Sequence, residues 1–406
     1  MDIVSHTLAP IALEGGKPVR ESFLPFGTPC LGEEEIAEVV DTIKSGWIGT
    51  GPKTIRFEQM FRDYVGSEYA VAVSSCTAGL HLSLIAAGVG PGDEVITSPM
   101  TFAATGNVII HQGATPVFVD IDPKTLNIKP ELIEGRITER TKAIIPVHFG
   151  GLACEMDEIM AIARQHGLLV IEDAAHAIGA RYHGKMVGSI GDLTSFSFYA
   201  NKNMTTAEGG MVTTNNAAFA EKLQIYRLHG LSRDAWQRFK VKRLMLSECI
   251  YPGYKYNMTD LQASLGIHQL EKLESFLAIR ERYAEMFDDA FRDMPEVSLQ
   301  PRPKGGDDRH ALHLYVLILD LTRLRVDRNT ILSALRAENI GAAWHYKALH
   351  LHPYYRERFG YKEGMFPNAE YVSERILSLP LTPRMTEQDV RDVITAVHKV
   401  IEFYRV

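Results

Sequence analysis

Short apolar runs alternate with segments of helical periodicity along the first half of the chain. Seven runs have the length of a buried strand, at residues 69–73, 94–97, 116–119, 143–148, 168–172, 194–198 and 211–214. Between several of them, apolar residues recur every three or four positions, at residues 77–87, 101–111 and 156–166. This alternation is typical of βαβ units. We therefore expect an α/β fold with a mostly parallel sheet that is covered by helices on both faces.

The pattern changes after residue 256. A long segment of helical periodicity, residues 258–291, is followed by a Pro/Gly-rich stretch at 302–308 and an apolar strand at 312–320. A chain of 406 residues is longer than a single core usually allows. We expect two domains: residues 1–256, an N-terminal segment with a large domain, and residues 257–406, a long connecting helix with a smaller C-terminal α/β domain. The leading residues, before about position 63, are expected to pack near the second domain.

Composition and charge exclude several classes of protein. Apolar residues make up 46% of the chain and charged residues 23%, which is ordinary for a globular protein. The net charge of -7 is spread along the chain without a basic block, so a nucleic-acid partner is not expected. No run of about eighteen apolar residues and no signal-peptide pattern occurs, which predicts a cytoplasmic protein without a membrane partner. The four cysteines are far apart and suggest neither disulfides nor zinc.

Polar residues at strand ends are the candidates for chemistry, because ligands of open α/β sheets bind beyond the carboxyl ends of the strands. The first candidate is the stretch SSCTAGL, residues 74–80, where small residues join a strand to a helix. Backbone N–H groups at such a helix start can hold an anion. Tight packing of the turn is the alternative interpretation.

The second candidate is VIEDAAHAIGA, in which an apolar strand ends at Glu172 and Asp173 and His176 follows three residues later. A buried carboxylate needs a cationic partner, because burying an unpaired charge costs free energy. Helix capping by Asp173 is the alternative.

The third candidate is Lys202, in SFSFYANKNMTTAEGG. A lysine in a loop is usually a solvated surface charge. Here Phe196 and Phe198 indicate a buried strand just before it, and the pair Gly209-Gly210 permits the close approach of another backbone or a ligand.

An anion-binding turn, a buried strand-end carboxylate and a buried lysine together describe a pyridoxal phosphate site. The lysine amine can form a Schiff base with the cofactor aldehyde, and the turn can hold the phosphate. The carboxylate can keep the pyridine nitrogen protonated, so that the ring accepts electrons.

The chain also resembles the DegT-type nucleotide-sugar aminotransferases, which have the aspartate aminotransferase fold (fold type I). The likeness extends from about residue 24 to beyond residue 380. It is carried by the segments GWIGTGPKTIRFEQMF, AVAVSSCTAGLHLSLIAAGVGPGDEVITSPMTF, GATPVFVDIDPKTLNI, KAIIPVHFGG, VIEDAAHAIGA, FSFYANKNMTTAEGGMV and PGYKYNMTDLQASLG. Within the family, the chain looks most like the UDP-4-amino-4-deoxy-L-arabinose:oxoglutarate aminotransferases.

The resemblance implies roles for individual residues. Lys202 would carry the cofactor, Asp173 would pair with the pyridinium nitrogen, and His176 would lie beside the ring near its 3-hydroxyl. Phe102 would stack on the ring face. The phosphate would be bound by Ser197, by Thr77 and by the backbone near Cys76.

The resemblance also implies an obligate homodimer with shared active sites. A polar residue of GYKYNMTD would reach the cofactor of the neighbouring subunit, with Asn257 as the candidate and Lys255 as the alternative. The chain departs from the arabinose-type pattern in two places. Phe102 stands where those enzymes often have Trp, and residues 232–251, with Lys240, Lys242 and Arg243, match the family poorly.

The expected reaction is a two-step amino transfer from L-glutamate to a keto sugar nucleotide. A UDP-linked 4-keto sugar is the first choice of acceptor, and a keto-octulosonate or a cyclitol ketone is the alternative. The identity of the sugar remains open. The product of the pathway also remains open among lipopolysaccharide, another surface polysaccharide and an antibiotic. Dehydratases of the family have histidine where this chain has Lys202, which favours amino transfer. A non-catalytic PLP-binding regulator is a further alternative.

Several histidines lie in the C-terminal half of the chain. His345, His350 and His352 suggest a metal site, but without a matching carboxylate or cysteine arrangement we expect structural or substrate-lining roles and no metal. The segments that contain His310, His313, His345 and Tyr346 resemble substrate-facing parts of the family.

Overall fold

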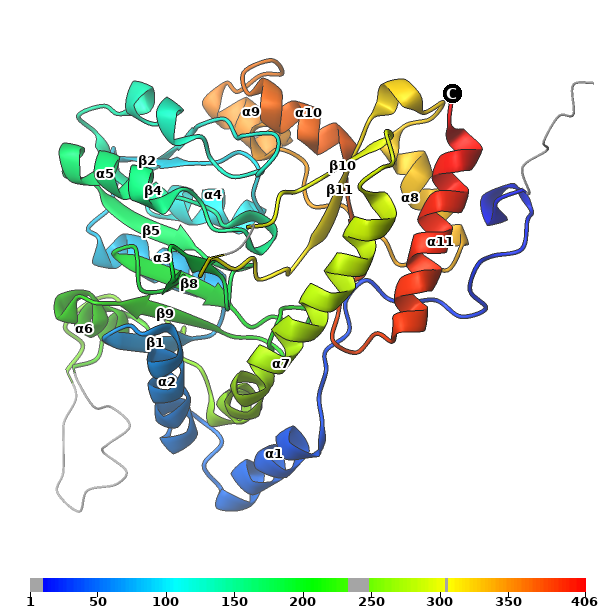
Figure 1. The fold of residues 1–406 in the computed structure, drawn as a ribbon. Coiled ribbons are helices and arrows are strands. Elements are labelled where there is room, and N and C mark those ends of the chain that lie inside the picture. The colour runs from blue at the N-terminus through cyan, green and yellow to red at the C-terminus, as the bar shows by residue number, and fades with distance from the viewer. Residues whose placement is uncertain (1–9, 233–247, 304–305) are drawn as a thin grey trace, which may run out of the picture.

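The computed structural model describes residues 10–232, 248–303 and 306–406. Its main sheet has seven strands in the order β1-β9-β8-β5-β4-β2-β3 (Figure 1). Their bounds are β1 Tyr69–Val73, β2 Glu94–Thr97, β3 Thr115–Phe118, β4 Thr141–Ile145, β5 Leu169–Asp173, β8 Leu193–Ser197 and β9 Gly210–Thr214. β9 pairs antiparallel with both β1 and β8, and the other pairs are parallel. The expected α/β fold with a mostly parallel sheet is confirmed.

Helices cover both faces of this sheet because successive strand residues point in opposite directions. In β2, Val95 packs with one set of helices and Ile96 with the other. One face is covered by α3 Cys76–Ala86, α4 Ala103–His111 and α6 Ala217–Tyr226, and the other by α2 Pro52–Val65, α5 Met156–His166 and the first part of α7 Asp260–Phe291. A two-stranded hairpin, β6 Arg181–Tyr182 and β7 Lys185–Met186, projects beside them.

A second, three-stranded antiparallel sheet lies in the C-terminal part, in the order β10-β11-β12. Its strands are β10 Val297–Leu299, β11 Tyr315–Leu319 and β12 Ile376–Leu379. The helices α8 Arg328–Ala337 and α11 Glu387–Tyr404 share one core with it, and α9 Pro353–Phe359 and α10 Pro367–Arg375 share another. Short 3-10 helices occupy Ala12–Glu14, Pro130–Leu132, Glu134–Arg136, Phe149–Gly151, Leu321–Arg323 and Leu349–Leu351.

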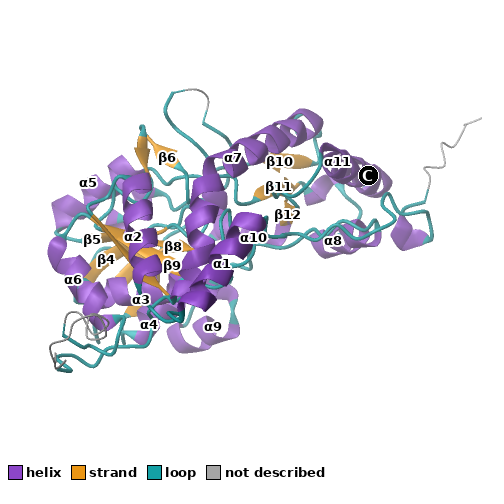
Figure 2. Ribbon diagram, turned by 90° about the horizontal axis from the view of Figure 1, so that it is seen from below, coloured by secondary structure: helices purple, strands orange, loops and turns teal. Residues whose placement is uncertain are grey.

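The long helix α7 joins the two sheets. Its 32 residues begin at the capping box of Thr259 and Gln262. Leu270 and Leu273 pack in the core of the large sheet, whereas Phe287 and Phe291 pack in the core of the small one. Figures 1 and 2 show α7 passing between the two parts of the molecule.

The leading residues divide between the two parts. Ile11 is buried in the core of the small sheet, and Leu24 forms a parallel bridge with Ile340. The helix α1 Glu33–Ser45 instead packs against α7, as α2 does. The domain boundary near residue 256 stays a prediction.

Most expected elements begin or end at slightly different residues from those observed, and two of these differences have a local physical reason. The run expected at 143–148 corresponds to β4, which begins two residues earlier, at Thr141. β4 ends at Ile145, because the next residue, Pro146, has no N–H to donate to the sheet. The Pro146 carbonyl still accepts a hydrogen bond from the Asp173 N–H at 2.9 Å. The helix expected at 101–111 begins at Ala103, because Phe102 has extended backbone angles and is the N-cap.

Candidate active site

A cavity of about 380 Å³ lies at the carboxyl ends of β5 and β8 and the N-terminus of α3. Segments of the C-terminal part close it from the other side, with His313, His345 and Tyr346. The predicted cofactor-binding residues that line this cavity are Cys76, Thr77, Phe102, Asp173, His176, Ser197 and Lys202. Asn257 is the one predicted cofactor residue outside this lining.

Lys202 lies in the loop that follows β8. A turn places it there, since its N–H donates to the Tyr199 carbonyl at 3.0 Å. The side chain as a whole is partly exposed, but its amine is buried, and Nζ lies 3.3 Å from Nε2 of His313. Burial lowers the pKa of Lys202 to about 8, although the Cys76 thiol and the Asp173 carboxylate act in the opposite direction. Lys202 therefore has an amine that can lose and regain a proton near neutral pH.

Asp173 ends β5 and is 5% exposed. Its Oδ2 accepts from the Thr105 hydroxyl at 2.7 Å, and its Oδ1 accepts from the Ala175 N–H at 3.1 Å. Burial raises the pKa of this carboxyl, although both hydrogen bonds and the charge of Lys202 lower it. Asp173 thus orders the turn after β5 and faces the cavity, and the helix-capping interpretation is wrong, because turns and no helix follow β5. A buried carboxylate in this position favours a cationic ligand atom such as a protonated ring nitrogen.

An anion site is formed by the N-terminus of α3. The hydroxyl of Ser75, the N-cap, accepts from the Ala78 N–H at 3.1 Å. The first helical residues, Cys76 and Thr77, have no intrahelical acceptor for their N–H groups. A side chain on Gly210 would put its Cβ 2.6 Å from the Ser75 carbonyl carbon, so only glycine lets β9 run this close to the turn. The expected close approach is therefore to another backbone at Gly210, whereas Gly209 lines the cavity.

Ser197 and the aromatic rings of Phe102 and Tyr346 also line the cavity. The Ser197 hydroxyl oxygen accepts from the Tyr199 N–H at 3.4 Å, which leaves its own proton for a ligand. The ring centroids of Phe102 and Tyr346 lie 5.8 Å apart, and Phe102 is 60% exposed. An exposed aromatic face beside an anion site and a carboxylate suits a flat, phosphorylated aromatic cofactor.

His176 has a fixed hydrogen-bonding pattern. Its Nδ1 accepts from the Gly150 N–H at 3.3 Å, and its Nε2 lies 3.1 Å from the Tyr346 hydroxyl. Because Nδ1 is an acceptor, the proton lies on Nε2 and the ring is neutral. Burial, together with the charge of Lys202, lowers the pKa of His176 well below its ordinary value.

Asn257 lies apart from these residues. Its Nδ2 donates to the Thr50 hydroxyl at 2.6 Å, and its buried Oδ1 has no hydrogen-bond partner among the described residues. Lys255 is exposed. Lys240, Lys242 and Arg243 lie outside the described residues.

Three other histidines of the C-terminal half lie in different places. His345 lines the cavity described above, and His310 lines a second cavity. His350 pairs with Glu370 at 2.9 Å. That carboxylate partner of His350 was not expected from the sequence. In the described ranges, no group of three or more His, Cys, Asp or Glu side chains could hold a metal ion.

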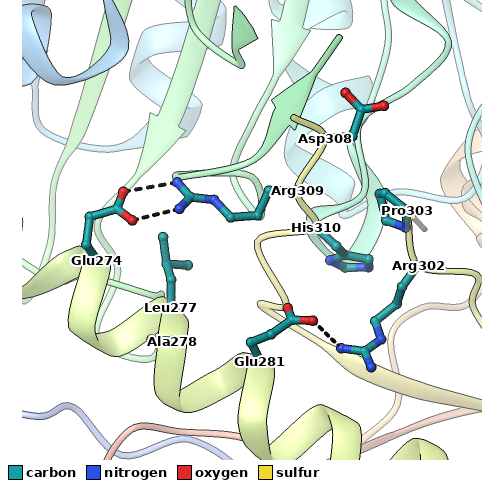
Figure 3. Close-up of a pocket in the computed structure, with 9 residues that line it drawn as sticks. All are labelled: Glu274, Leu277, Ala278, Glu281, Arg302, Pro303, Asp308, Arg309 and His310. Carbon is teal, nitrogen blue, oxygen red and sulfur yellow. Dashed lines mark hydrogen bonds and ion pairs between the residues drawn. The ribbon is translucent and has the colours of Figure 1, made fainter. Parts of the chain in front are cut away.

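The cavity that contains His310 has a volume of about 270 Å³ and lies between α7 and residues 302, 303 and 308–310. Four of its charged side chains form two pairs (Figure 3). Glu274 binds Arg309 through two hydrogen bonds of 2.7 and 3.0 Å, and Glu281 binds Arg302 at 2.6 Å. The fifth, Asp308, has a buried Oδ1 without a partner among the described residues. One unpaired carboxylate does not define a ligand, so we assign no chemistry to this cavity.

Sequence reasoning missed two contributors to the main cavity. Thr105 holds the Asp173 carboxylate, and its own oxygen lies 2.7 Å from the Thr101 hydroxyl. Glu208 lines the cavity next to Gly209. Thr105 lies 68 residues before Asp173, and no motif links the two.

In the part of the chain that the structure describes, no helix is long and apolar enough to cross a membrane.

Comparison with known proteins adds to this geometry. Residues 29–398 match the model of the DegT/DnrJ/EryC1/StrS aminotransferase family. The chain is 52% identical to the spore coat polysaccharide biosynthesis protein SpsC of Bacillus subtilis over 94% of this chain and 98% of SpsC. It is also similar to a solved structure, the putative sugar aminotransferase Spr1654 from Streptococcus pneumoniae in its PMP form. The TM-score is 0.87 and the identity 36%, over 94% of this chain and 99% of that one.

Two further structural matches concern ligands. The same pneumococcal protein is matched in its PLP form and in an apo form. DesI, solved in the presence of its TDP-sugar product, is similar with a TM-score of 0.83 and 28% identity, over 96% of each chain.

Proposed function

The chain belongs to the DegT/DnrJ/EryC1/StrS aminotransferase family and is a sugar aminotransferase that uses pyridoxal phosphate, and from this premise we propose that it transfers the amino group of L-glutamate to a keto sugar nucleotide. The observation that supports this most is the placement of one buried amine, Lys202, in the same cavity as Asp173 and the α3 N-terminus. An amine, a carboxylate and an anion site are the three groups that this cofactor requires.

The residues present fit the cofactor. The N–H groups of Cys76 and Thr77, with the Ser197 hydroxyl, would hold its phosphate, and Asp173 would hold its ring nitrogen in the protonated form. Phe102 would cover one face of the ring. When bound, the cofactor supplies an electron sink that makes the α-hydrogen of the amino donor acidic.

The chain itself must then move one proton. Lys202 is suited to this because burial lowers its pKa to about 8, so that a useful fraction of Nζ is neutral near pH 7.5. In the proposal, Nζ would accept the proton from the α-carbon of glutamate and release it again inside the cavity. In the second half-reaction, with the keto sugar, Nζ moves a proton in the reverse direction.

The nature of the acceptor is a further part of the proposal. A UDP-linked 4-keto sugar is our first choice, and a keto-octulosonate or a cyclitol ketone is the alternative. The arabinose-type assignment rests on motifs such as PGYKYN and TKAIIPVH alone. DesI is named with a TDP-sugar product, which supports nucleotide sugars as the class. The predicted cytoplasmic location belongs to the proposal as well.

A homodimer with shared active sites is also proposed. The resemblance implies it, and Asn257, with Lys255 as the alternative, stays the candidate for the residue that reaches the neighbouring cofactor. The cavity also has no cationic lining side chain other than Lys202 among the described residues, histidines aside. The carboxylates of glutamate therefore call for a cation from elsewhere.

The visible absorption spectrum of the purified protein, before and after adding L-glutamate, tests the function. We expect the cofactor band to bleach with glutamate and to return when the keto sugar nucleotide is added. A band that glutamate leaves unchanged would refute the donor and favour a regulator. The absence of any band, even after adding pyridoxal phosphate, would refute the site.

A further inference from the structure

His313 is the hydrogen-bond partner of Lys202 Nζ among the described residues. It lies just before β11 in the C-terminal part of the chain, and its side chain is buried. Its Nε2 is 3.3 Å from Nζ, although 111 residues separate the two in sequence. The contact therefore joins the reactive amine to a segment of the other half of the protein.

Asn203 fixes the position of the proton on His313. Its Nδ2 donates to the Ala311 carbonyl at 2.6 Å, which identifies the nitrogen end of the amide. The other end, Oδ1, lies 3.3 Å from Nδ1 of His313. An amide oxygen can only accept, so Nδ1 must carry the proton. The lone pair of Nε2 is then free and faces Nζ.

His176 has the opposite arrangement, although its ring centroid is only 4.6 Å from that of His313. Its Nδ1 accepts from the Gly150 N–H, so its proton lies on Nε2, toward Tyr346. Two neutral imidazoles next to Lys202 thus have opposite tautomers, and His313 is the one that presents an acceptor to the amine. Burial, with the charge of Lys202 as the second cause, lowers the pKa of both rings.

We propose that His313 is a positioning residue whose Nε2 accepts a hydrogen bond from Lys202 Nζ and stabilises its ammonium form whenever the amine is not bonded to the cofactor. Asn203 acts through His313 by fixing the tautomer. The inference rests on the proposed function only in that Lys202 is the reacting amine. Its consequence is that Nζ is held in the cavity between the two half-reactions.

The pH at which Lys202 loses its proton measures this bond directly. The titratable groups that line the cavity with Nζ are Cys76 from α3, Asp173 from β5, the histidines 176, 313 and 345, Glu208, and the tyrosines 199 and 346. We would label the full-length protein, cleared of cofactor, with acetic anhydride across a pH series and quantify the Lys202 peptide by mass spectrometry. The labelling midpoint reports the ionisation of Nζ without any substrate or turnover.

His313→Phe removes the acceptor while preserving a buried ring. We expect the Lys202 midpoint to fall by about one pH unit, the size of the shift when a hydrogen bond to a charged group is lost. His313→Gln offers an amide oxygen in place of Nε2 and should restore the midpoint. His345→Phe is the matched control, because His345 lines the same cavity but bonds to Ser378, and it should leave the midpoint unchanged.

Three results would overturn the proposal: an unchanged midpoint in His313→Phe, an equal fall in His313→Gln, or an equal fall in His345→Phe. If His313→Phe does not fold, His313→Met removes the acceptor with a more adaptable side chain and gives the same readout. Failure of the amino-transfer proposal would appear instead as an unresponsive absorption spectrum with normal Lys202 labelling. The two ideas can therefore fail separately.

Discussion

Two buried cations lie in different regions of the molecule and have different surroundings. Lys202 faces a cavity and has an imidazole as its partner. Arg280 of α7 is 2% exposed in the packed junction between the long helix and the small sheet. Its Nη1 donates to the carbonyls of Leu312 at 3.1 Å and Leu381 at 2.7 Å, and no carboxylate of the described residues pairs with it.

The difference shows that burial of a cation does not by itself mark a reactive group. Burial lowers the pKa of Arg280 to about 9, so the guanidinium stays charged at neutral pH and serves as a fixed double donor. Burial lowers the pKa of Lys202 to about 8, close enough to neutral pH for the amine to change its state. The empty space beside Lys202 admits a ligand, whereas two backbone carbonyls occupy Nη1 of Arg280 and its Nε is buried without a partner among the described residues. One cation is therefore expected to serve chemistry and the other stability.

The largest effect should come from Lys202→Ala, which removes the amine. Turnover with L-glutamate should fall by roughly 10⁴-fold or more, measured as oxoglutarate release. Without cofactor, the Lys202→Ala variant should have a thermal midpoint at pH 7 that is equal to or higher than that of the wild-type protein. The reason is that a lysine whose folded pKa lies below its unfolded value costs stability at any pH below the folded pKa. That cost diminishes only as the pH rises from about 8 toward 10.5. Near-normal turnover would contradict the assignment of Lys202.

Asp173→Asn tests the carboxylate in the same region. The amide keeps the shape and can still accept from the Ala175 N–H, but it cannot hold a protonated ring nitrogen. We expect turnover to fall by about 10²- to 10³-fold, the range found when one preorganised electrostatic group is removed. The Thr105→Ser variant, which keeps the hydroxyl that contacts Asp173, is the control and should stay close to wild type. Activity of Asp173→Asn within tenfold of wild type would argue against its role.

The pH dependence of cofactor-free Asp173→Asn sharpens this point. Burial raises the folded pKa of Asp173, so the ionised carboxylate costs stability once the pH exceeds its unfolded value. The variant should therefore melt slightly higher than wild type at pH 7, and the difference should shrink as the pH falls toward 4. Differential scanning calorimetry at both pH values measures it. A lower midpoint at pH 7 would contradict the direction of the pKa shift.

Arg280→Met tests the other region. It leaves the carbonyls of Leu312 and Leu381 without donors, which should reduce the free energy of unfolding by about 2 kcal/mol. Chemical denaturation measures this change, and the glutamate response of the absorption spectrum should remain. A loss of that response at a temperature where the variant is folded would show that the two regions are coupled, through the neighbouring residue His313.

Arg280→Lys should have the smallest effect. An ammonium keeps the charge and has N–H groups for both carbonyls, but the shorter lysine side chain does not bring its nitrogen to the position of Nη1, which donates to both. We expect a loss of about 1 kcal/mol in the free energy of unfolding by the same denaturation assay. A loss as large as that of Arg280→Met would mean that the position of the donor nitrogen, rather than the charge, accounts for the whole contribution.

Much of the fold and part of the candidate site could be predicted from short-range patterns. The runs at 69–73 and 94–97 coincide with β1 and β2, because apolar strands bounded by turns can be recognised from the local sequence. Asp173 and Lys202 could be singled out because each follows a buried strand, and parallel strand ends meet at one edge. Thr105 was missed because no motif links it to Asp173, and Glu208 because its segment was interpreted only through Lys202 and the two glycines. The role of Asn257 and the domain boundary stay predictions.

The sequence by itself determined the α/β alternation, the strand ends that supply the carboxylate and the amine, and the small residues that start α3. The tertiary structure alone decided which distant groups complete the cavity. His313 meets Lys202 across 111 residues, and Tyr346 meets His176 across 170. The tautomer of His313 depends on Asn203, which comes close only when the C-terminal part packs against the large sheet, and that of His176 depends on Gly150, which the fold of the large-sheet part brings near. Local patterns report backbone preference and burial, whereas the position of a proton depends on which donor and acceptor the folded chain brings together.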